Sequence, residues 1–376
     1  MDNQKEPLYM QIYRQLKEDL IAGKYSKNQL ISEHVVSKQF FVSRITSRKA
    51  LDMLAEENLI IRVKGKGSYV SPHVMSLSKK YEDAFGRKPI GVIFPDIADS
   101  FGRRLLVAID NRCREHNILC MFCRSEGNQE REQQCIEEMI EYGVAGIIIM
   151  PVHDVYYNAT VLKLILDGFP VVVIDRELKN IPAHFVGSDN IEAGKNAMDF
   201  LIQLGHKKIG IYSHGLIKTS SIEDRLYGIQ TSLKANNLTD GAVYFENIFS
   251  TLPGSGETQD TFENDFQAVM AHLQENLDIT AIVALEYQIA MVVKSAAYRL
   301  GIDVPKDLSI LCFDSPARNH GNALPYEFTH IRQDEETIGQ EAFDLLLSLT
   351  QSLDISKPAR KIFPCLLECG ASTCMV

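Results

Sequence analysis

Residues 42–51 read VSRITSRKAL, a short amphipathic stretch with three basic side chains, Arg44, Arg48 and Lys49. The chain as a whole is acidic, with a formal net charge of −10. Ser43 can cap the free backbone N–H groups of a helix that carries the rest of the stretch. On that helix the three basic side chains point away from the apolar face. They are therefore predicted to face solvent and to be available to phosphates or base edges.

The sequence on either side completes a small domain. Residues 7–22 repeat a leucine or isoleucine at every fourth position, which indicates an amphipathic helix. A second, shorter helix is predicted to begin after Ser32. After Asn58, two apolar runs flank KGKG at residues 64–67, which indicates a hairpin with a basic, glycine-rich tip. Three helices followed by such a hairpin predict a winged helix-turn-helix.

The formal charge also differs between this small domain and the rest of the chain. Residues 1–80 carry a formal net charge of +6, and the remaining residues carry −16. This asymmetry predicts a small module that faces a polyanion and a large one that does not. A charged helix face alone is commonly just solvated, but the helix, the hairpin and the local charge together favour DNA contact. A phosphate-binding P-loop in VKGKGS is excluded, because the first glycine of that motif is missing.

Residues 6–71 resemble the DNA-binding domain of GntR-family transcription regulators. The resemblance rests on motifs in a fixed order: Ser32-Glu33, VSR at 42–44, RKAL at 48–51 and GKGSYV at 65–70. It implies a winged helix-turn-helix that binds operator DNA. The residues expected at the DNA are Ser43, Arg44, Thr46, Arg48, Lys49, Lys64, Lys66 and Gly67.

Three positions depart from the pattern of this family: Ile31, Phe41 and Ser47. Phe41 occupies a turn position where glycine or asparagine is frequent. A positive φ at this residue would cost about 1 to 2 kcal/mol. The turn before the third helix is therefore the part of the domain whose geometry is least predictable from the family.

From Pro89 onward, apolar strands alternate with helical segments. Continuous apolar strands between helices predict an α/β fold, with parallel sheets covered on both faces. Two such series, joined near residues 187–191, predict two Rossmann-like lobes with a cleft between them.

Ligands of open α/β sheets bind at the carboxyl ends of the strands. Carboxylate, amide and guanidinium groups with an aromatic plate suit the hydroxyls and the apolar ring face of a sugar. Carboxylates at strand ends also cap helices, so each of them has a structural alternative. The candidate ligand residues are Asp99, Ser100, Phe101, Arg124, Asp175, Arg176, Asp189, Arg225, Glu286, Tyr287 and Asp314.

Residues 89–376 resemble the effector-binding domain of LacI/GalR-family regulators and periplasmic sugar-binding proteins. The matching stretches are GVIFPD (91–96), GSDNIEAGKNAMDFLIQLGHKKIGIYS (187–213), DRLYGIQTSL (224–233), PKDLSILCFDSP (305–316) and FTHIRQDEETIGQEA (328–342). The resemblance implies that Arg225 and Asp314 contact sugar hydroxyls. Where the family carries Asn-Asp, this chain has Glu286 and Tyr287, so the identity of the sugar does not carry over.

The two resemblances together predict the domain boundaries. A winged helix-turn-helix is expected over residues 1–71, a linker over 72–88 and a two-lobed, periplasmic-binding-protein-type domain over 89–376. Lobe N is expected to hold residues 89–188 and 331–352, and lobe C residues 189–330 and 353–376. The chain is thus expected to pass between the lobes near residues 189, 331 and 352. This arrangement is that of the arabinose-repressor (AraR) branch of the GntR family.

The predicted function is a transcription regulator that acts as a homodimer on a palindromic operator and responds to a sugar or sugar derivative. A repressor is the favoured form. An activator, or a nucleoside-like effector, remains an alternative. A transport protein is disfavoured by the attached head, and an enzyme by the absence of a dinucleotide fingerprint, a kinase phosphate loop and a nucleophile elbow. No catalytic residue, metal or cofactor is expected.

The eight cysteines are scattered through the chain. Cys120 and Cys123 form a C-x-x-C in an apolar run, with no second ligand pair at zinc spacing, so reduced structural cysteines are predicted. There is no run of about 18 apolar residues, and the N-terminus has neither a basic nor an apolar signal region. A cytoplasmic protein without membrane insertion is therefore expected.

Overall fold

The computed structural model describes residues 7–21, 24–25, 30–63, 67–71, 88–152, 156–214, 219–253, 259–316, 328–351 and 357–376. The chain divides into two compact units, Met1–Arg87 and Lys88–Val376. Among the helices of these ranges, none is long and apolar enough to cross a membrane.

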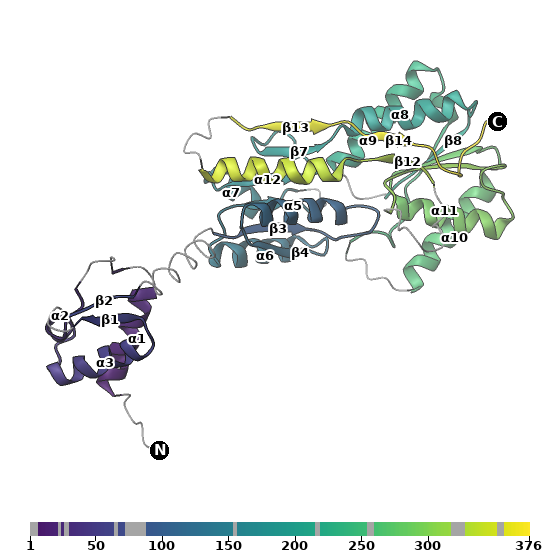
Figure 1. Cartoon of the computed structure of the whole chain (residues 1–376). Helices are drawn as coiled ribbons and strands as arrows, with labels where there is room; N and C mark the ends of the chain where they lie inside the picture. The colour runs from purple at the N-terminus through teal and green to yellow at the C-terminus, as the bar shows by residue number, and fades with distance from the viewer. Residues whose placement is uncertain are drawn as a thin grey trace. The chain divides into compact units, whose positions relative to one another are not determined.

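The first unit is a winged helix-turn-helix (Figure 1). Its elements are α1 (Leu8–Ile21), α2 (Glu33–Gln39), α3 (Arg44–Glu56), β1 (Ile60–Val63) and β2 (Gly67–Val70), the last two antiparallel. The hydroxyls of Ser32 and Ser43 cap α2 and α3, as predicted, by accepting from the backbone N–H groups of Val35 and Thr46. The apolar stripe of α1 packs against the buried face of α3 in one core.

The turn between α2 and α3 contains the strained residue that the sequence brought into question. Phe41 has a φ of 55°. Its side chain is 95% exposed, whereas the neighbouring Phe40 packs against the core. The left-handed backbone conformation at Phe41 is therefore destabilising, and burial of the Phe41 ring does not offset it, because the ring is exposed.

Phe41→Asn is expected to stabilise the first unit by about 1 kcal/mol, because asparagine tolerates positive φ and the exposed ring contributes little packing. Hydrogen exchange of the α1–α3 amides, measured in the full-length chain, should be slower in the variant than in the wild type. Faster exchange would show that the ring supports the fold after all.

The second unit consists of two lobes, each built on a six-stranded sheet (Figure 1). The first sheet has the order β13-β7-β6-β5-β3-β4. Its strands are β3 (Ile90–Phe94), β4 (Cys120–Arg124), β5 (Ile147–Ile149), β6 (Val171–Ile174), β7 (His184–Ser188) and β13 (Arg360–Phe363). Helices α5 (Arg103–Glu115) and α12 (Glu335–Gln351) cover one face, and α6 (Gln129–Glu141) and α7 (Ala159–Leu166) cover the other.

The second sheet repeats this plan with the order β14-β12-β11-β10-β8-β9. Its strands are β8 (Ile209–Tyr212), β9 (Ala242–Phe245), β10 (Ala281–Ala284), β11 (Ser309–Phe313), β12 (Thr329–Arg332) and β14 (Leu366–Glu368). Helices α8 (Asn190–Gln203) and α9 (Ser220–Ala235) pack on one face, and α10 (Gln259–Glu275) and α11 (Tyr287–Leu300) on the other. Of the described strand pairs in both sheets, only β12–β14 is antiparallel.

The last passage between the lobes differs from the expected one. From the sequence, this passage is placed near residue 352, and that prediction is wrong. Strand β13 pairs with β7 in the first sheet, and β14 pairs with β12 in the second, so the chain crosses between Phe363 and Leu366. The physical reason is the edge of β7: strand β13 pairs with its exposed N–H and C=O groups before the chain leaves the first lobe.

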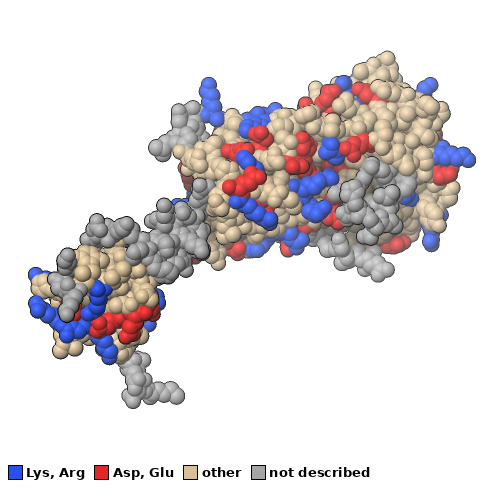
Figure 2. All heavy atoms as spheres, in the orientation of Figure 1, with Lys and Arg blue, Asp and Glu red and all other residues tan. Residues whose placement is uncertain are grey.

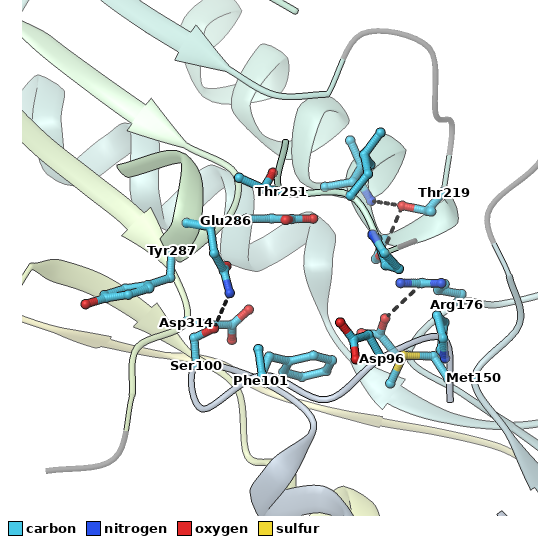
Figure 3. A pocket seen from close by; sticks show the side chains of 18 of the residues that line it. Asp96, Ser100, Phe101, Met150, Arg176, Thr219, Thr251, Glu286, Tyr287 and Asp314 are labelled. Atoms are coloured by element: carbon cyan, nitrogen blue, oxygen red, sulfur yellow. Dashed lines mark hydrogen bonds and ion pairs between the residues drawn. The ribbon is translucent and has the colours of Figure 1, made fainter. Parts of the chain in front are cut away.

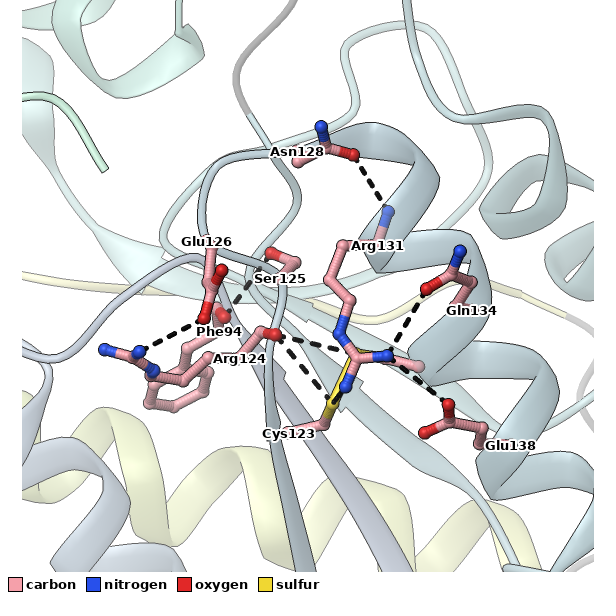
Figure 4. Close-up of a disulfide and its surroundings, with 10 residues drawn as sticks. Phe94, Cys123, Arg124, Ser125, Glu126, Asn128, Arg131, Gln134 and Glu138 are labelled. Atoms are coloured by element: carbon pink, nitrogen blue, oxygen red, sulfur yellow. Dashed lines mark hydrogen bonds and ion pairs between the residues drawn. A yellow bond between two sulfur atoms is a disulfide. The ribbon is translucent and has the colours of Figure 1, made fainter. Parts of the chain in front are cut away.

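The reduced state predicted for every cysteine is also corrected. A disulfide joins Cys123 of β4 to Cys135 of α6, with their Cα atoms 6.2 Å apart (Figure 4). Side chains alternate along β4, so Cys120 packs with Cys113 in the core under α5, and Cys123 faces α6. The two cysteines of the C-x-x-C therefore lie on opposite faces of the sheet, and the partner of Cys123 comes from the next helix.

Candidate ligand cleft and DNA-binding face

A cavity of about 140 Å³ lies between the lobes of the second unit, and the labelled residues line it (Figure 3). The ring of Tyr287 is turned away from the cavity and packs against Phe328. Because the strands of both sheets are almost all parallel, their carboxyl ends deliver polar loops to this one place. The polar lining residues are Asp96, Ser100, Asp175, Arg176, Thr219, Ser221, Arg225, Thr251, Glu286, Tyr287, Gln288, Asp314 and Gln333. Phe101, Met150, Ile222 and Leu252 contribute apolar surface.

Most of the residues chosen from the sequence line this cavity. They are Ser100, Phe101, Asp175, Arg176, Arg225, Glu286, Tyr287 and Asp314. The structure places the other three outside the lining. Asp99 pairs with Arg103 at 3.3 Å on the surface. Arg124 donates to Asp96 at 2.9 Å, and Asp189 caps α8 by accepting from the N–H of Glu192.

Sequence reasoning missed several cleft residues, including Asp96, Thr251 and Gln333. Gln333 directly follows β12, so the same strand-end rule could have found it. Thr251 lies several residues beyond the end of β9, and nothing in its sequence position signals the cleft.

Arg225 is held in the cleft by several contacts with buried groups. It lies on α9, is 4% exposed, and its guanidinium stacks 4.2 Å from the centroid of the Phe313 ring. Its Nε donates to Asn190 Oδ1 and its Nη1 to the carbonyl oxygen of Leu285, both at 2.8 Å. Its Nη2 lies 4.0 Å from Asp314 Oδ2. These contacts fix the fork of donors before any ligand arrives.

Asp175 and Asp314 occupy equivalent places in the two lobes. Asp175 directly follows β6 and Asp314 directly follows β11, and these strands hold the same place in the order of the two sheets. Both residues have positive φ, 61° and 64°. Burial raises the pKa of both carboxyl groups, that of Asp314 to about 7, although neighbouring arginines oppose the shift. Gln333 donates to both oxygens of Asp314, at 3.0 and 3.2 Å, and so holds the carboxyl group toward the cleft.

Glu286 is supported from behind by a buried histidine. Nε2 of His214 lies 3.0 Å from Glu286 Oε2, and its Nδ1–H donates to the carbonyl oxygen of Ile248 at 3.0 Å. Burial opposes charge on both groups, but their mutual attraction raises the pKa of His214 and lowers the pKa of Glu286. The pair therefore presents a fixed carboxylate to the cavity.

Asp314→Asn is expected to change how the stability of the second unit depends on pH. The pKa of Asp314 is about 7 in the folded chain, against about 3.9 in an unfolded one. Stability from this group is thus present below about pH 4 and is lost as the pH rises through 7. The melting temperature of the variant relative to wild type should therefore rise by several degrees between pH 5 and pH 8. A difference that stays constant in thermal unfolding across this range would contradict the assignment.

Two of the predicted DNA-binding residues, Arg44 and Gly67, line a groove on the first unit. Arg44 is exposed in the first turn of α3 and lines this groove with Ser32, Glu33, Arg62 and Gly67. The hydroxyls of Ser43 and Thr46 share a hydrogen bond of 2.8 Å at the same helix end. Lys64 and Lys66 lie outside the described residues.

Two of the predicted contacts are already engaged within the unit. Arg48 is 61% exposed but donates to both oxygens of Glu33, at 2.9 and 3.1 Å. Lys49 places its Nζ 3.8 Å from the centroid of the Tyr9 ring on α1. Basic and acidic side chains accordingly lie next to each other on the visible face of this unit (Figure 2).

Comparison with known families gives an assignment to each part of the chain. Residues 8–70 match the bacterial regulatory proteins of the gntR family, and residues 198–373 match a periplasmic binding protein-like domain. The chain is 25% identical to the arabinose metabolism transcriptional repressor of Geobacillus stearothermophilus over 359 residues, which is 93% of each protein. It is 23% identical to the repressor of the same name from Halalkalibacterium halodurans, over 91% of this chain and 89% of that one.

Solved structures share the fold. A ribose-bound LacI family transcriptional regulator from Enterococcus faecium superposes with a TM-score of 0.63 at 22% identity, covering 77% of this chain and 100% of that one. A periplasmic binding protein/LacI transcriptional regulator from Alkaliphilus metalliredigens, complexed with D-xylulofuranose, gives 0.61 at 22% identity, covering 76% and 99%. Taken together, these matches identify the chain as a transcription regulator in which a gntR-family winged helix-turn-helix is joined to a periplasmic binding protein-like domain.

Proposed function

We propose that this regulator is a repressor that binds a palindromic operator as a homodimer in the cytoplasm and releases it when an uncharged sugar binds between the lobes. Residues 1–71 bind DNA, residues 89–376 bind the sugar, and residues 72–88 connect the two. The observation that carries the proposal is the cleft, where polar side chains from both lobes and the ring of Phe101 surround one small cavity. The arabinose repressors and the two sugar-bound structures support the same choice of ligand.

The charges of the cleft favour a neutral ligand. Four carboxyl groups line it, those of Asp96, Asp175, Glu286 and Asp314, against two arginines. Arg225 already donates to two protein oxygens, and Nη1 of Arg176 donates to the carbonyl oxygen of Pro151 at 2.7 Å. A phosphate or an acid group would lie against Asp96 and Glu286, and against Asp175 and Asp314, whose raised pKa values show that burial there disfavours negative charge. Sugar hydroxyl groups can donate to ionised carboxyl groups and accept from protonated ones.

Contacts between the lobes define an arrangement of the two lobes that a ligand can stabilise. Lys179 of the first lobe pairs with Asp224 of α9 at 2.7 Å, and Gln288 of α11 donates to Ser100 at 3.0 Å. A sugar that bridges both lobes adds to these contacts and stabilises the arrangement in which they form. If the heads are then held at the wrong separation, operator affinity falls by the coupling free energy, about 1 to 3 kcal/mol.

The two sheets also offer a surface for dimerisation. Strands β4 and β9 occupy equivalent edges of the two sheets. They carry exposed apolar side chains, Phe122 and Tyr244, with Leu119 directly before β4. Edges of this kind are ready to pair. A two-fold dimer would present two heads to two half-sites.

A panel of ligands tests the choice of effector. Thermal unfolding of the full-length protein is measured with L-arabinose, D-ribose, D-xylose and D-glucose, with their phosphates and aldonic acids, and with nucleosides. One uncharged sugar should raise the melting temperature by several degrees, because saturation at 100 times Kd stabilises the folded state by about 2.7 kcal/mol. A response to phosphates alone would refute the neutral ligand, and a response to nucleosides alone would refute the sugar.

A further inference from the structure

Two large apolar side chains project into solvent where α2 turns into α3. Phe41 in the turn is 95% exposed, the highest value for a large apolar side chain among the described residues, and Ile45 in the first turn of α3 is 79% exposed. Arg44 directly precedes Ile45 and is itself exposed. The pair is thus an apolar tip at the start of the helix that carries the basic side chains.

The fold gives no reason for a phenylalanine at this position. The φ of 55° at Phe41 is unfavourable for a large side chain, and the exposed ring buries nothing. Phe40 already fills the adjacent place in the core. A residue that strains the backbone and gains no packing points to a contact made outside the domain.

The position of the tip identifies what it contacts. In helix-turn-helix proteins the N-terminal residues of the second helix of the motif reach the base edges of the major groove. The only apolar group displayed there is the C5-methyl of thymine, which phenylalanine and other apolar side chains contact. The neighbouring Arg44, in a sequence region of net charge +6, suits the phosphates on either side. Two side chains beside an arginine also make a far smaller patch than a protein-docking surface.

We propose that Phe41, together with Ile45, reads thymine methyl groups in the operator and so contributes to sequence specificity. This inference rests on the DNA-binding function of the first unit. It goes beyond it by assigning direct readout to apolar side chains, in addition to the predicted basic ones.

Replacing a thymidine of the duplex with deoxyuridine removes the C5-methyl group of the base and nothing else. The probe is a fluorescent duplex selected from a random-sequence library by the full-length wild-type protein. Each thymine of one half-site is replaced in turn, and affinity is measured by anisotropy at fixed salt. At one or two neighbouring positions the wild type should lose roughly fourfold in affinity, the effect of one methyl group no longer buried.

Variants assign this effect to the side chain. Phe41→Asn should bind the thymine duplex roughly fourfold more weakly than wild type, and it should no longer distinguish thymine from deoxyuracil at that position. Phe41→Leu keeps an apolar side chain and should keep the distinction. Because Phe41→Asn is expected to be at least as stable as wild type, a loss of affinity cannot be ascribed to unfolding.

Each other outcome overturns a different statement. If the wild type selects no specific duplex, the DNA-binding function itself fails. If it binds a duplex but is indifferent to deoxyuracil at every position, or if Phe41→Asn retains wild-type affinity and discrimination, methyl readout by Phe41 is refuted. In that case the apolar tip would be reassigned to a protein contact.

Discussion

Arg225→Ala should lower the affinity for the sugar at least about 100-fold and leave a protein that stays on its operator when sugar is present. The guanidinium is fixed by Asn190, the carbonyl of Leu285 and the ring of Phe313, so it offers its remaining donors to the cleft in one orientation. Hydrogen bonds to a charged group contribute about 1.5 to 3 kcal/mol each, and two of them account for the expected loss. Its removal also takes the nearest positive charge from Asp314.

Isothermal titration calorimetry measures the affinity, and circular dichroism establishes that the variant is folded. Arg103→Ala is the matched control, because Arg103 is an exposed arginine that pairs with Asp99 outside the cleft lining. Arg225→Lys keeps the charge but not the fork, and should recover only part of the affinity. Sugar binding within threefold of wild type in Arg225→Ala would remove this residue from the site.

Gly228→Ala should destabilise the second unit by about 3 kcal/mol and weaken sugar binding with it. Helices α8 and α9 cross in close contact, and a Cβ at Gly228 would lie only 1.9 Å from the carbonyl oxygen of Ile191. That oxygen belongs to the backbone, so α9 itself must move, and Arg225 moves with it. A Cβ at Gly194, on the facing helix, would likewise lie only 2.1 Å from the carbonyl oxygen of Arg225.

Urea unfolding of the full-length chain, followed by far-UV circular dichroism, measures the loss of stability. Tyr227→Ala is the control on the same helix: its side chain is exposed, and the change should stay within about 0.5 kcal/mol. A Gly228→Ala protein with the wild-type midpoint would mean that the two helices have room to separate.

Local patterns determined much of what the sequence could predict about the fold. The caps at Ser32 and Ser43 depend on a hydroxyl directly before a helix, and the strands depend on short apolar runs. The third passage between the lobes was missed because β13 is short and half-exposed, so no apolar run announces it. The disulfide was missed for a related reason: Cys123 and Cys135 meet only through the packing of α6 on β4.

The cleft residues likewise divide into those that a local sequence pattern predicts and those that depend on the folded chain. Residues directly after strands, such as Asp175 and Asp314, were found because parallel strands deliver their carboxyl ends to one edge. Asp189 also directly follows a strand, but it caps a helix. Its position in the sequence alone does not distinguish helix capping from ligand binding. Partners distant in sequence, such as Glu33 with Arg48, exist only in the folded chain.

The most direct test of the proposed mechanism is operator affinity with and without sugar. Full-length protein is titrated onto the selected fluorescent duplex in the absence and presence of saturating sugar, at constant salt. We predict that the operator Kd rises at least about tenfold in wild type, equivalent to a coupling free energy of about 1.4 kcal/mol, and does not change in Arg225→Ala. A sugar that binds by calorimetry but leaves the operator Kd unchanged would contradict control of DNA binding by the cleft.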